Sequence, residues 1–158
     1  LKKKQYIKIK LNKIATHHLE LRAKINGVKG RFILDTGASN SCVGIDLIEY
    51  FKLSAEESEI KAAGAGAIGM ETQKSVNNTL KIGKWKTNES HLVLFDMTHV
   101  NLALTEHSAS EVHEIIGADI LEKGKSIIDY DKLILYLKKE GIFKRKRMIE
   151  KEISEVPF

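Results

Sequence analysis

Alternating hydrophobic and polar residues run through most of the chain and predict short β-strands. Residues 6–11 and 19–25 alternate with a period of two, which is typical of a strand with one buried face. The pair Asn26-Gly27 follows, and these two residue types tolerate the positive φ angles of a two-residue hairpin turn. Residues 28–34 then form the return strand. We therefore expect a β-hairpin that delivers Asp35 to the end of a strand.

The rest of the chain continues this pattern, interrupted by two short helical segments. Further strands are expected at residues 39–43, 75–82, 85–95, 114–117, 126–130 and 133–137, with strand and loop between 98 and 113. One short helix is expected at residues 46–53, behind an Asp46 cap, and another after Gly117, ending at Gly124. About nine strands with mostly short connections predict an all-β domain and exclude a doubly wound α/β domain.

One segment, within residues 61–73, is rich in glycine and alanine and almost free of charge. Its centre reads Gly64, Ala65, Gly66, Ala67, Ile68, Gly69. Glycine leaves no side chain to pack and loses the most entropy on ordering, so we expect the moving tip of a hairpin, with a plain flexible linker as the alternative. No Lys-Ser/Thr pair follows these glycines, which argues against a phosphate-binding loop.

Composition narrows the class of protein. The 158 residues, of which 42% are hydrophobic, fit a single folded domain. The single cysteine, Cys42, excludes an intrachain disulfide and a cysteine-rich zinc site, and the six histidines show no metal-ligand spacing, so no metal or cofactor is expected.

No apolar run approaches the roughly 18 residues of a membrane-spanning helix, which argues against a membrane partner. The chain begins with Leu1, consistent with a trimmed N-terminus, and the cytoplasm is the expected compartment.

The net charge of +5 is concentrated at the C-terminal end. Seven basic and four acidic residues follow residue 137, so we expect a folded domain at residues 1–137 and a basic tail at residues 138–158. The cluster Lys144-Arg145-Lys146-Arg147 could bind phosphates, but no aromatic residues are interleaved with it. We interpret the tail as solvated, with nucleic-acid binding as the weaker alternative.

The chemistry of the chain is expected at Asp35. Phe32, Ile33 and Leu34 bury the approach to this carboxylate, and Gly37 lets another chain come close. If two such loops met with their oxygens about 3 Å apart, two full charges would repel by roughly 5 kcal/mol at an effective dielectric near 20, so the pair would hold one proton. One carboxyl group is then a general base and the other a general acid. The structural alternative is an ordinary turn aspartate.

Two motifs resemble those of a known family. Leu34-Asp35-Thr36-Gly37-Ala38-Ser39 resembles the active-site signature of aspartic proteases, and Ile115-Ile116-Gly117-Ala118-Asp119 resembles the second motif of retropepsin-like members, which packs behind the catalytic loop. The glycine-rich segment lies between the two motifs, where that family carries its flap, and the resemblance covers roughly residues 5–137. It implies a closed-barrel-like retropepsin fold with a flap hairpin and one or two short helices.

The resemblance also implies an activity and an assembly. The chain holds one signature, so two identical chains would each supply Asp35 to a metal-free site that hydrolyses a peptide or protein substrate. By the same resemblance, Thr36 hydrogen-bonds across the dimer, Gly37 and Ser39 contact the substrate backbone, and Gly64 to Gly69 close over it. A dimeric module that binds peptides without cleaving them is the alternative.

For several residues, the sequence allows more than one interpretation. Asp119 is interpreted as a helix cap, with a brace for the Asp35 loop as the alternative. Ser39, Asn40 and Ser41 stand where retroviral enzymes often place an acidic residue, which makes the chain more similar to cellular, bacterial-type members. Apolar residues that could form substrate pockets are Ile33, Val43, Ile68, Met70 and Leu94.

Overall fold

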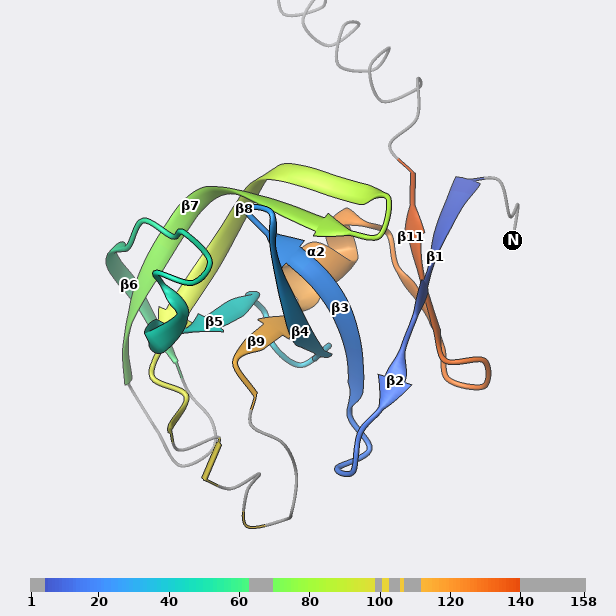
Figure 1. Cartoon of the computed structure of the whole chain (residues 1–158), viewed down its shortest axis with the longest axis horizontal. Coiled ribbons are helices and arrows are strands. Elements are labelled where there is room, and N and C mark those ends of the chain that lie inside the picture. Colours follow the sequence, from blue (N-terminus) through green and yellow to red (C-terminus); the bar gives the residue numbers. More distant parts are fainter. Residues whose placement is uncertain (1–4, 63–69, 99–100, 103–105, 107–111, 140–158) are drawn as a thin grey trace, which may run out of the picture.

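The computed structural model describes residues 5–62, 70–98, 101–102, 106 and 112–139 (Figure 1). Its strands are β1 (Tyr6–Lys10), β2 (Asn12–Lys13), β3 (Leu19–Ile25), β4 (Val28–Leu34), β5 (Cys42–Gly44), β6 (Glu56–Ala62), β7 (Met70–Ile82), β8 (Trp85–Phe95), β9 (Glu114–Ile116), β10 (Ile127–Asp129) and β11 (Ile134–Lys138). A 3₁₀ turn, η2 (Ile45–Leu47), and a short helix, α2 (Ala118–Lys123), complete these elements. The protein is therefore mostly β, as the alternating pattern predicted.

The strands form two sheets, and the larger one closes on itself. Eight strands follow the order β2-β3-β4-β9-β5-β8-β7-β6, and β3 also pairs with β7. This extra pairing joins β3, β4, β9, β5, β8 and β7 into a closed barrel (Figure 1). The smaller sheet has the order β1-β11-β10 and lies beside the barrel. The all-β, closed-barrel fold predicted from the sequence is confirmed.

The predicted hairpin before Asp35 is formed with the expected turn. β3 and β4 pair antiparallel from Leu19 opposite Leu34 to Ile25 opposite Val28, and Asn26 and Gly27 have φ angles of 50° and 82°. The Asn26 side chain also fixes this turn to other segments. Its amide donates to the carbonyl of Phe51 at 2.9 Å, and its oxygen accepts from the amide of Thr79 at 3.0 Å.

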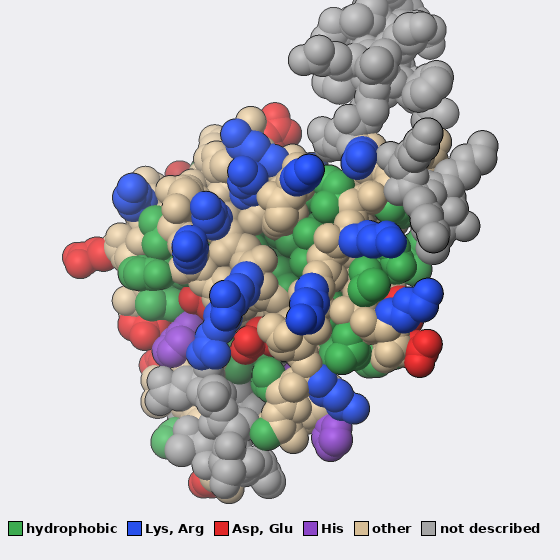
Figure 2. All heavy atoms as spheres, turned by 45° about the vertical axis from the view of Figure 1, so that its right-hand side comes forward, with side chains coloured by type: hydrophobic (Ala, Val, Ile, Leu, Met, Phe, Trp, Pro, Cys, Tyr) green, Lys and Arg blue, Asp and Glu red, His purple; other side chains and the backbone are tan. Residues whose placement is uncertain are grey.

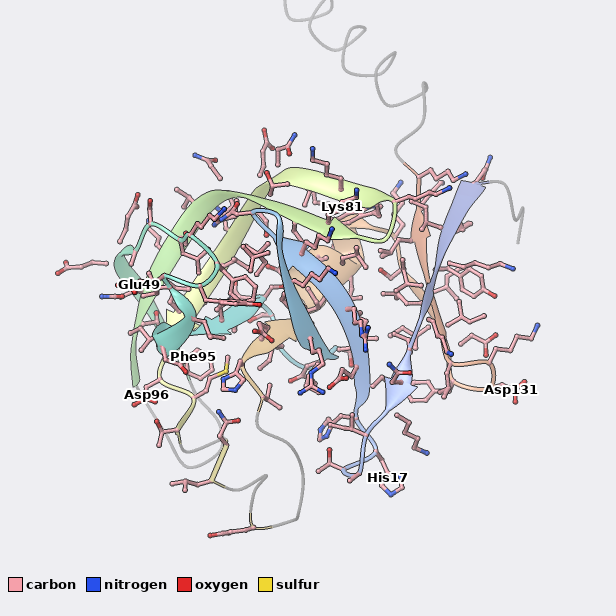
Figure 3. The ribbon with its side chains drawn as sticks, in the orientation of Figure 1. His17, Glu49, Lys81, Phe95, Asp96 and Asp131 are labelled. Carbon is pink, nitrogen blue, oxygen red and sulfur yellow. The ribbon has the colours of Figure 1, made fainter. Side chains whose placement is uncertain are left out.

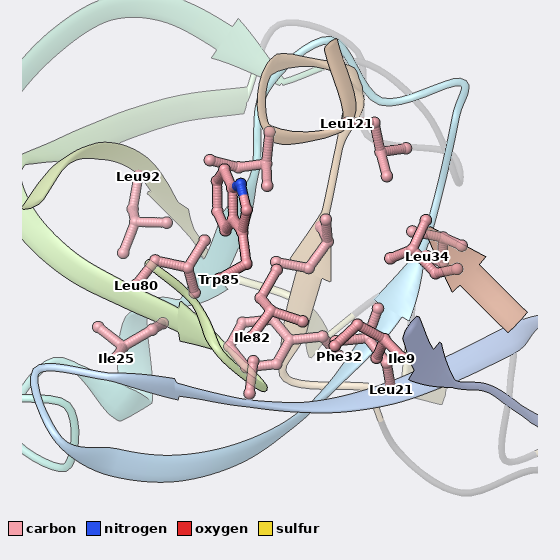
Figure 4. Packing of buried hydrophobic residues seen from close by; sticks show 14 of the residues in the cluster. Ile9, Leu21, Ile25, Phe32, Leu34, Leu80, Ile82, Trp85, Leu92 and Leu121 are labelled. Carbon is pink, nitrogen blue, oxygen red and sulfur yellow. The ribbon is translucent and has the colours of Figure 1, made fainter. Parts of the chain in front are cut away.

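The period-two pattern separates a dry interior from a charged exterior. Inward-facing residues such as Leu21, Phe32, Leu80 and Ile116 are fully buried and form one hydrophobic cluster inside the barrel (Figure 4). Most outward-facing positions of the barrel strands carry polar and charged side chains (Figure 2 and Figure 3). The barrel is thus a packed core that provides a rigid base for the loops at the ends of its strands.

The helix predicted at residues 46–53 is not formed. The backbone makes the 3₁₀ turn η2 and then further turns, and Lys52 has a φ of 56°, which ends any helical path. Gly44 is the N-cap and makes no side-chain cap bond, so Asp46 does not cap this segment. The reason is tertiary: the fully buried Phe51 turns inward and packs against Phe32, with ring centroids 6.4 Å apart.

Several other boundaries differ from the pattern. The strand predicted at residues 75–82 begins at Met70, the one predicted at residues 39–43 begins at Cys42, and the described residues add the strands β2 and β6. Within residues 98–113, the described positions contain no strand; Asn101 is helical, and its amide donates to the carbonyl of Met97 at 2.9 Å.

Two further predictions concern the C-terminal tail and a membrane-spanning helix. β11 ends at Lys138, and residues 140–158 lie outside the described part, so the boundary between domain and tail stays a prediction. In the part of the chain that the structure describes, no helix is long and apolar enough to cross a membrane.

Candidate active site

Asp35 lies at the end of β4, where the barrel wall gives way to a loop. Its backbone amide donates to the carbonyl of Ile116 at 2.9 Å, which continues the parallel ladder between β4 and β9 by one residue. Leu34, directly before it, is 8% exposed, whereas the aspartate itself is only half-buried. The Asp35 carboxylate therefore lies at the edge of the buried barrel wall, and the neighbouring strand β9 holds the backbone of Asp35 in place.

The loop after Asp35 folds back on the carboxylate. The amide of Gly37 donates to Asp35 Oδ1 at 2.9 Å, and the amide of Ala38 donates to the Asp35 carbonyl at 3.2 Å. A Cβ at position 37 would lie 3.3 Å from Asp35 Oδ1, so a larger residue would crowd the carboxylate. Thr36, Gly37 and Ser39 are exposed, which leaves them accessible to another molecule.

The second motif packs directly behind this loop, as the resemblance implied. Ile115 and Ile116 belong to β9, which lies between β4 and β5, and Gly117 connects β9 to α2. A Cβ at Gly117 would come within 2.6 Å of the Ala38 carbonyl oxygen, so only glycine fits this contact. The next amide, of Ala118, donates to that same oxygen at 2.7 Å.

Asp119 braces the loop and also accepts a hydrogen bond from the first turn of α2. Its carboxylate accepts hydrogen bonds from the Ser41 amide at 3.0 Å, the Ser41 hydroxyl at 2.8 Å and the Ile120 amide at 2.8 Å. The N-cap of α2 is Gly117, which makes no side-chain cap bond. The carboxylate therefore bonds both to the loop and to one amide of the first helical turn, so the two interpretations drawn from the sequence do not exclude each other.

Ser41 is the partner that sequence reasoning did not assign. It is fully buried, and its hydroxyl accepts from the Gly117 amide at 2.9 Å while it donates to Asp119. One buried hydroxyl thus joins the loop of the first motif to the glycine and the aspartate of the second. The available signal was a small hydroxyl residue six positions after Asp35, in a polar run that leads into a strand.

A row of apolar residues continues from Asp35 across the outer face of the sheet. Ile33 precedes Asp35 by two residues and therefore shares its face, and Ile33 pairs with Ile115, which pairs with Cys42. Val43 and Leu94 lie on the opposite side in the core and are fully buried. Of the pocket residues suggested from the sequence, these two cannot line a substrate site, and Ile33 remains possible by its position.

Cys42 is a structural thiol in this row. Burial, followed by the negative charges of Asp119 and Asp35, raises its pKa to about 12. The thiol donates to the Asn40 carbonyl at 3.1 Å. It therefore stays protonated at neutral pH and is a poor nucleophile.

A cavity of about 330 Å³ lies next to Ile33 on the barrel surface. Side chains with ionisable groups line it from several segments, among them Glu20, Arg31, His113 and Glu114. Glu114 is 6% exposed, and burial raises its pKa to about 7, with Arg31 opposing this shift and Asp46 and Glu20 adding to it. Sequence analysis treated Glu114 only as the first residue of a strand.

The remaining predicted site residues lie outside the described residues. Gly64, Ala65, Gly66, Ala67, Ile68 and Gly69 belong to the segment that connects β6 to β7. The two strands that flank this segment do pair, with Lys61 opposite Glu71 and Ala62 opposite Met70. Among the described residues, no group of histidine, cysteine and acidic side chains could hold a metal ion.

Comparisons with known proteins agree with this arrangement. The family model described as aspartyl protease matches residues 21–120. A retropepsin-like aspartic protease from Rickettsia conorii superposes with a TM-score of 0.57 at 20% identity, over 84% of this chain and 89% of that protein. The retroviral protease-like domain of Ddi1 from Leishmania major gives 0.52 at 17% identity, over 76% and 87%. Among curated proteins, no sequence matches.

The brace between Asp119 and Ser41 predicts a coupled loss of stability. Asp119→Ala leaves buried donors of Ser41 without an acceptor, and Ser41→Ala removes the shared hydroxyl, so each change should cost about 1–3 kcal/mol of unfolding free energy. Because both changes break the same contact, the double variant should lose less than the two single losses combined, by about 0.5–3 kcal/mol. Urea denaturation measures all three, with Glu122→Ala on the exposed side of α2 as control. Strictly additive losses would contradict the brace.

The buried carboxyl group of Glu114 should make the free energy of unfolding fall as the pH rises. Its pKa is about 7 in the folded chain against an ordinary value of 4.5, so the folded state binds the extra proton between these values and is destabilised above them. Glu114→Gln should therefore gain stability over the parent at pH 8, by roughly 3 kcal/mol at most, and little at pH 4.5. Urea denaturation at both pH values, with Glu49→Gln as an exposed control, measures this. An equal effect of Glu114→Gln at both pH values would rule out the burial of a titrating carboxyl.

Proposed function

The chain belongs to the aspartyl protease family, and on that premise we propose that it is an endopeptidase whose Asp35 works together with Asp35 of a second copy. The observation that carries this proposal is the setting of the carboxylate. Asp35 is held at a strand end by the Ile116 carbonyl and the Gly37 amide, yet it is half-exposed beside an apolar row. A fixed and accessible carboxylate next to a dry surface suits general acid–base chemistry on a bound peptide.

The proposed reaction uses only the two carboxyl groups and water. One ionised Asp35 takes a proton from a water molecule lying between the two side chains, and the water oxygen attacks the carbonyl carbon of the peptide bond. The protonated Asp35 of the other copy gives its proton to the carbonyl oxygen. When the tetrahedral intermediate with its two hydroxyl groups collapses, the first Asp35 returns its proton to the amine nitrogen as the carbon–nitrogen bond breaks. One of the two hydroxyl groups gives its proton to the other Asp35, which restores the starting protonation of both carboxyl groups. Each step conserves protons and needs no cofactor.

A second copy is proposed because one chain offers one such loop. In a two-fold dimer, residues near the axis meet their own copies, so Asp35 must lie near that axis. The three-stranded sheet supports association: β1 and β10 are its edges, and Ile127 and Tyr130, in and next to β10, are 38% and 71% exposed. Unpaired strand edges with exposed apolar side chains are suited to pairing with another chain.

The remaining parts of the site take the roles that the resemblance implies. We assign Thr36 to a hydrogen bond across the dimer, Gly37 and Ser39 to the substrate backbone, and Ala38 to the contact with the second motif. The segment from Gly64 to Gly69 is proposed as the flap, which the pairing of β6 with β7 supports by making this segment the connection of a hairpin. The substrate is a peptide or protein, and the tail predicted at residues 138–158 is proposed to follow the domain after Lys138, the last residue of β11.

Replacing Asp35 tests the proposed chemistry. Asp35→Asn keeps the size of the side chain but cannot ionise, so peptidase activity should fall by about 10²–10⁴-fold or more. The measurement is hydrolysis of a fluorogenic peptide library from acid to neutral pH. Asp131→Asn, in an exposed turn far from β4 (Figure 3), is the matched control and should keep full activity. Activity that survives Asp35→Asn would contradict the proposal, and binding of peptides by a parent that cleaves none would favour the peptide-binding module.

The dimer predicts a dependence of specific activity on protein concentration. Below the dissociation constant, a tenfold dilution should lower specific activity about tenfold, because the active species forms by mass action. Tyr130→Lys should move this fall to higher concentration, since it places a charge on the exposed apolar surface. Sedimentation velocity on the same samples measures the dimer directly. A constant specific activity in samples that sediment as monomers would refute the shared site.

A further inference from the structure

A row of lysines crosses four neighbouring strands on the outer face of the barrel. Lys29 on β4 lies directly opposite Lys24 on β3, Lys24 lies opposite Lys81 on β7, and Lys81 lies opposite Lys86 on β8. All four side chains are exposed, and Figure 3 labels Lys81 in the region where β7 meets β3. Since adjacent strands are about 4.8 Å apart, the row extends over roughly 14 Å.

Two arginines extend this row along the strands. Arg22 on β3 lies opposite Arg31 on β4, and both are exposed. We call these residues the cation row: Arg22, Lys24, Lys29, Arg31, Lys81 and Lys86. Like charges directly opposite one another destabilise a sheet. The only ion pair that any of the six makes within the described residues is a long one, 4.0 Å from Arg31 to Glu20.

The cation row surrounds a hollow on the surface. A cavity of about 550 Å³ is lined by five of the six cations and by the small residues Ala23, Gly30 and Gly83, with no acidic side chain among its described lining. Figure 2 shows Lys and Arg side chains spread over one face of the molecule. Small residues between long cationic side chains leave room for an extended anionic segment to lie between the charges.

This hollow adjoins the cavity beside Ile33, which precedes Asp35 by two residues. Arg31 and Ile33 alternate along β4, and Asp35 follows the strand directly, so the three residues share one face. The cavity beside Ile33 and the cavity of the cation row have Lys29 and Arg31 in common. From Ile33 to Lys29 the strand spans four residues, or about 13 Å, which an extended peptide of about four residues also spans.

We infer that the cation row is a second contact surface for the substrate, one that binds an acidic segment about four to eight residues away from the bond that is cleaved. This inference rests on the proposed function. Acidic side chains at alternate positions of an extended peptide recur about every 6.6–6.8 Å, so three of them match the length of the row. The preferred substrates are therefore polypeptides with clustered Asp and Glu on one side of the cleavage site.

The lining of the hollow favours a peptide over other partners. A groove for single-stranded nucleic acid combines positive charge with aromatic side chains on which bases stack, and the described lining contains no aromatic residue. A second copy of this chain is also disfavoured, since a two-fold contact through this face would place the cation row against itself.

Direct binding tests the inference without relying on catalysis. The probe is a fluorescein-labelled peptide of alternating Glu and Ser, and anisotropy is measured on the full-length Asp35→Asn protein at low and at moderate salt. The paired change Lys24→Gln and Lys81→Gln should weaken binding about tenfold, and added salt should shrink this difference. The control pair Lys13→Gln and Lys132→Gln removes the same charge from exposed positions on β2 and beyond β10, and should leave the affinity within about twofold.

Cleavage provides the second readout. Two substrates share one cleaved sequence, and only one of them carries an acidic extension. The paired change in the cation row should lower the ratio of kcat/KM for the extended substrate to that for the short substrate about tenfold, mainly through KM. Equal losses from the control pair would overturn the inference, because net charge alone would then explain them. Row-dependent binding of an RNA oligonucleotide more tightly than a peptide of equal charge would also overturn it, in favour of a nucleic-acid surface.

The two proposals fail in distinguishable ways. If neither substrate is cleaved but the acidic peptide binds through the cation row, the endopeptidase fails and the surface stands. If the short substrate is cleaved and the acidic extension changes nothing, the endopeptidase stands and the inference is wrong.

Discussion

The loop that carries Asp35 depends on one buried cluster of hydrogen bonds between two segments far apart in the sequence. Ser41 joins the Asp119 carboxylate to the Gly117 amide, and Ala118 binds the carbonyl of Ala38. Because Ser41 and Gly117 are buried, a bond that they failed to make would leave a desolvated polar atom. The loop geometry is therefore fixed by its partners on β9 and α2 and not by its own sequence alone. The closed barrel also holds the two motifs together, because β9 lies between β4 and β5 and places the second motif next to the first.

Charge is distributed around this rigid base in two contrasting ways. Acidic side chains lie in or near the apolar row, where burial raises the pKa values of Glu114 and Cys42 and so favours their neutral forms. Positive groups instead lie in register on the open face of β3, β4, β7 and β8, where water screens them but nothing in the described residues neutralises the lysines by an ion pair. Neither feature stabilises the fold by itself. Like charges opposite one another destabilise a sheet, and burial of an ionisable group disfavours its charged form. We propose the row of cations as part of a surface that binds an acidic peptide segment.

Individual elements show which parts of the structure could be predicted from the sequence. The hairpin β3–β4 was predicted with its bounds, because a period of two and an Asn-Gly turn are local signals that the fold does not override. The segment after Gly44 was misjudged, since its helical spacing yielded to the burial of Phe51 against Phe32 and Asn26. The interpretation of Asp119 as a helix cap was incomplete for a similar reason. A position near a helix start is visible in sequence, whereas the Ser41 amide and hydroxyl that it binds lie 78 residues away.

By itself, the sequence determined the class of fold and the position of the candidate carboxylate. Alternation, turn residues and the two motifs are carried by neighbours along the chain, so they could be recognised without knowing the contacts. Only the tertiary structure decided which residues brace that carboxylate, which apolar residues are closed inside the core, and that cations from four strands stand in one row. These properties depend on strand register and barrel closure, which bring together residues that no local pattern connects.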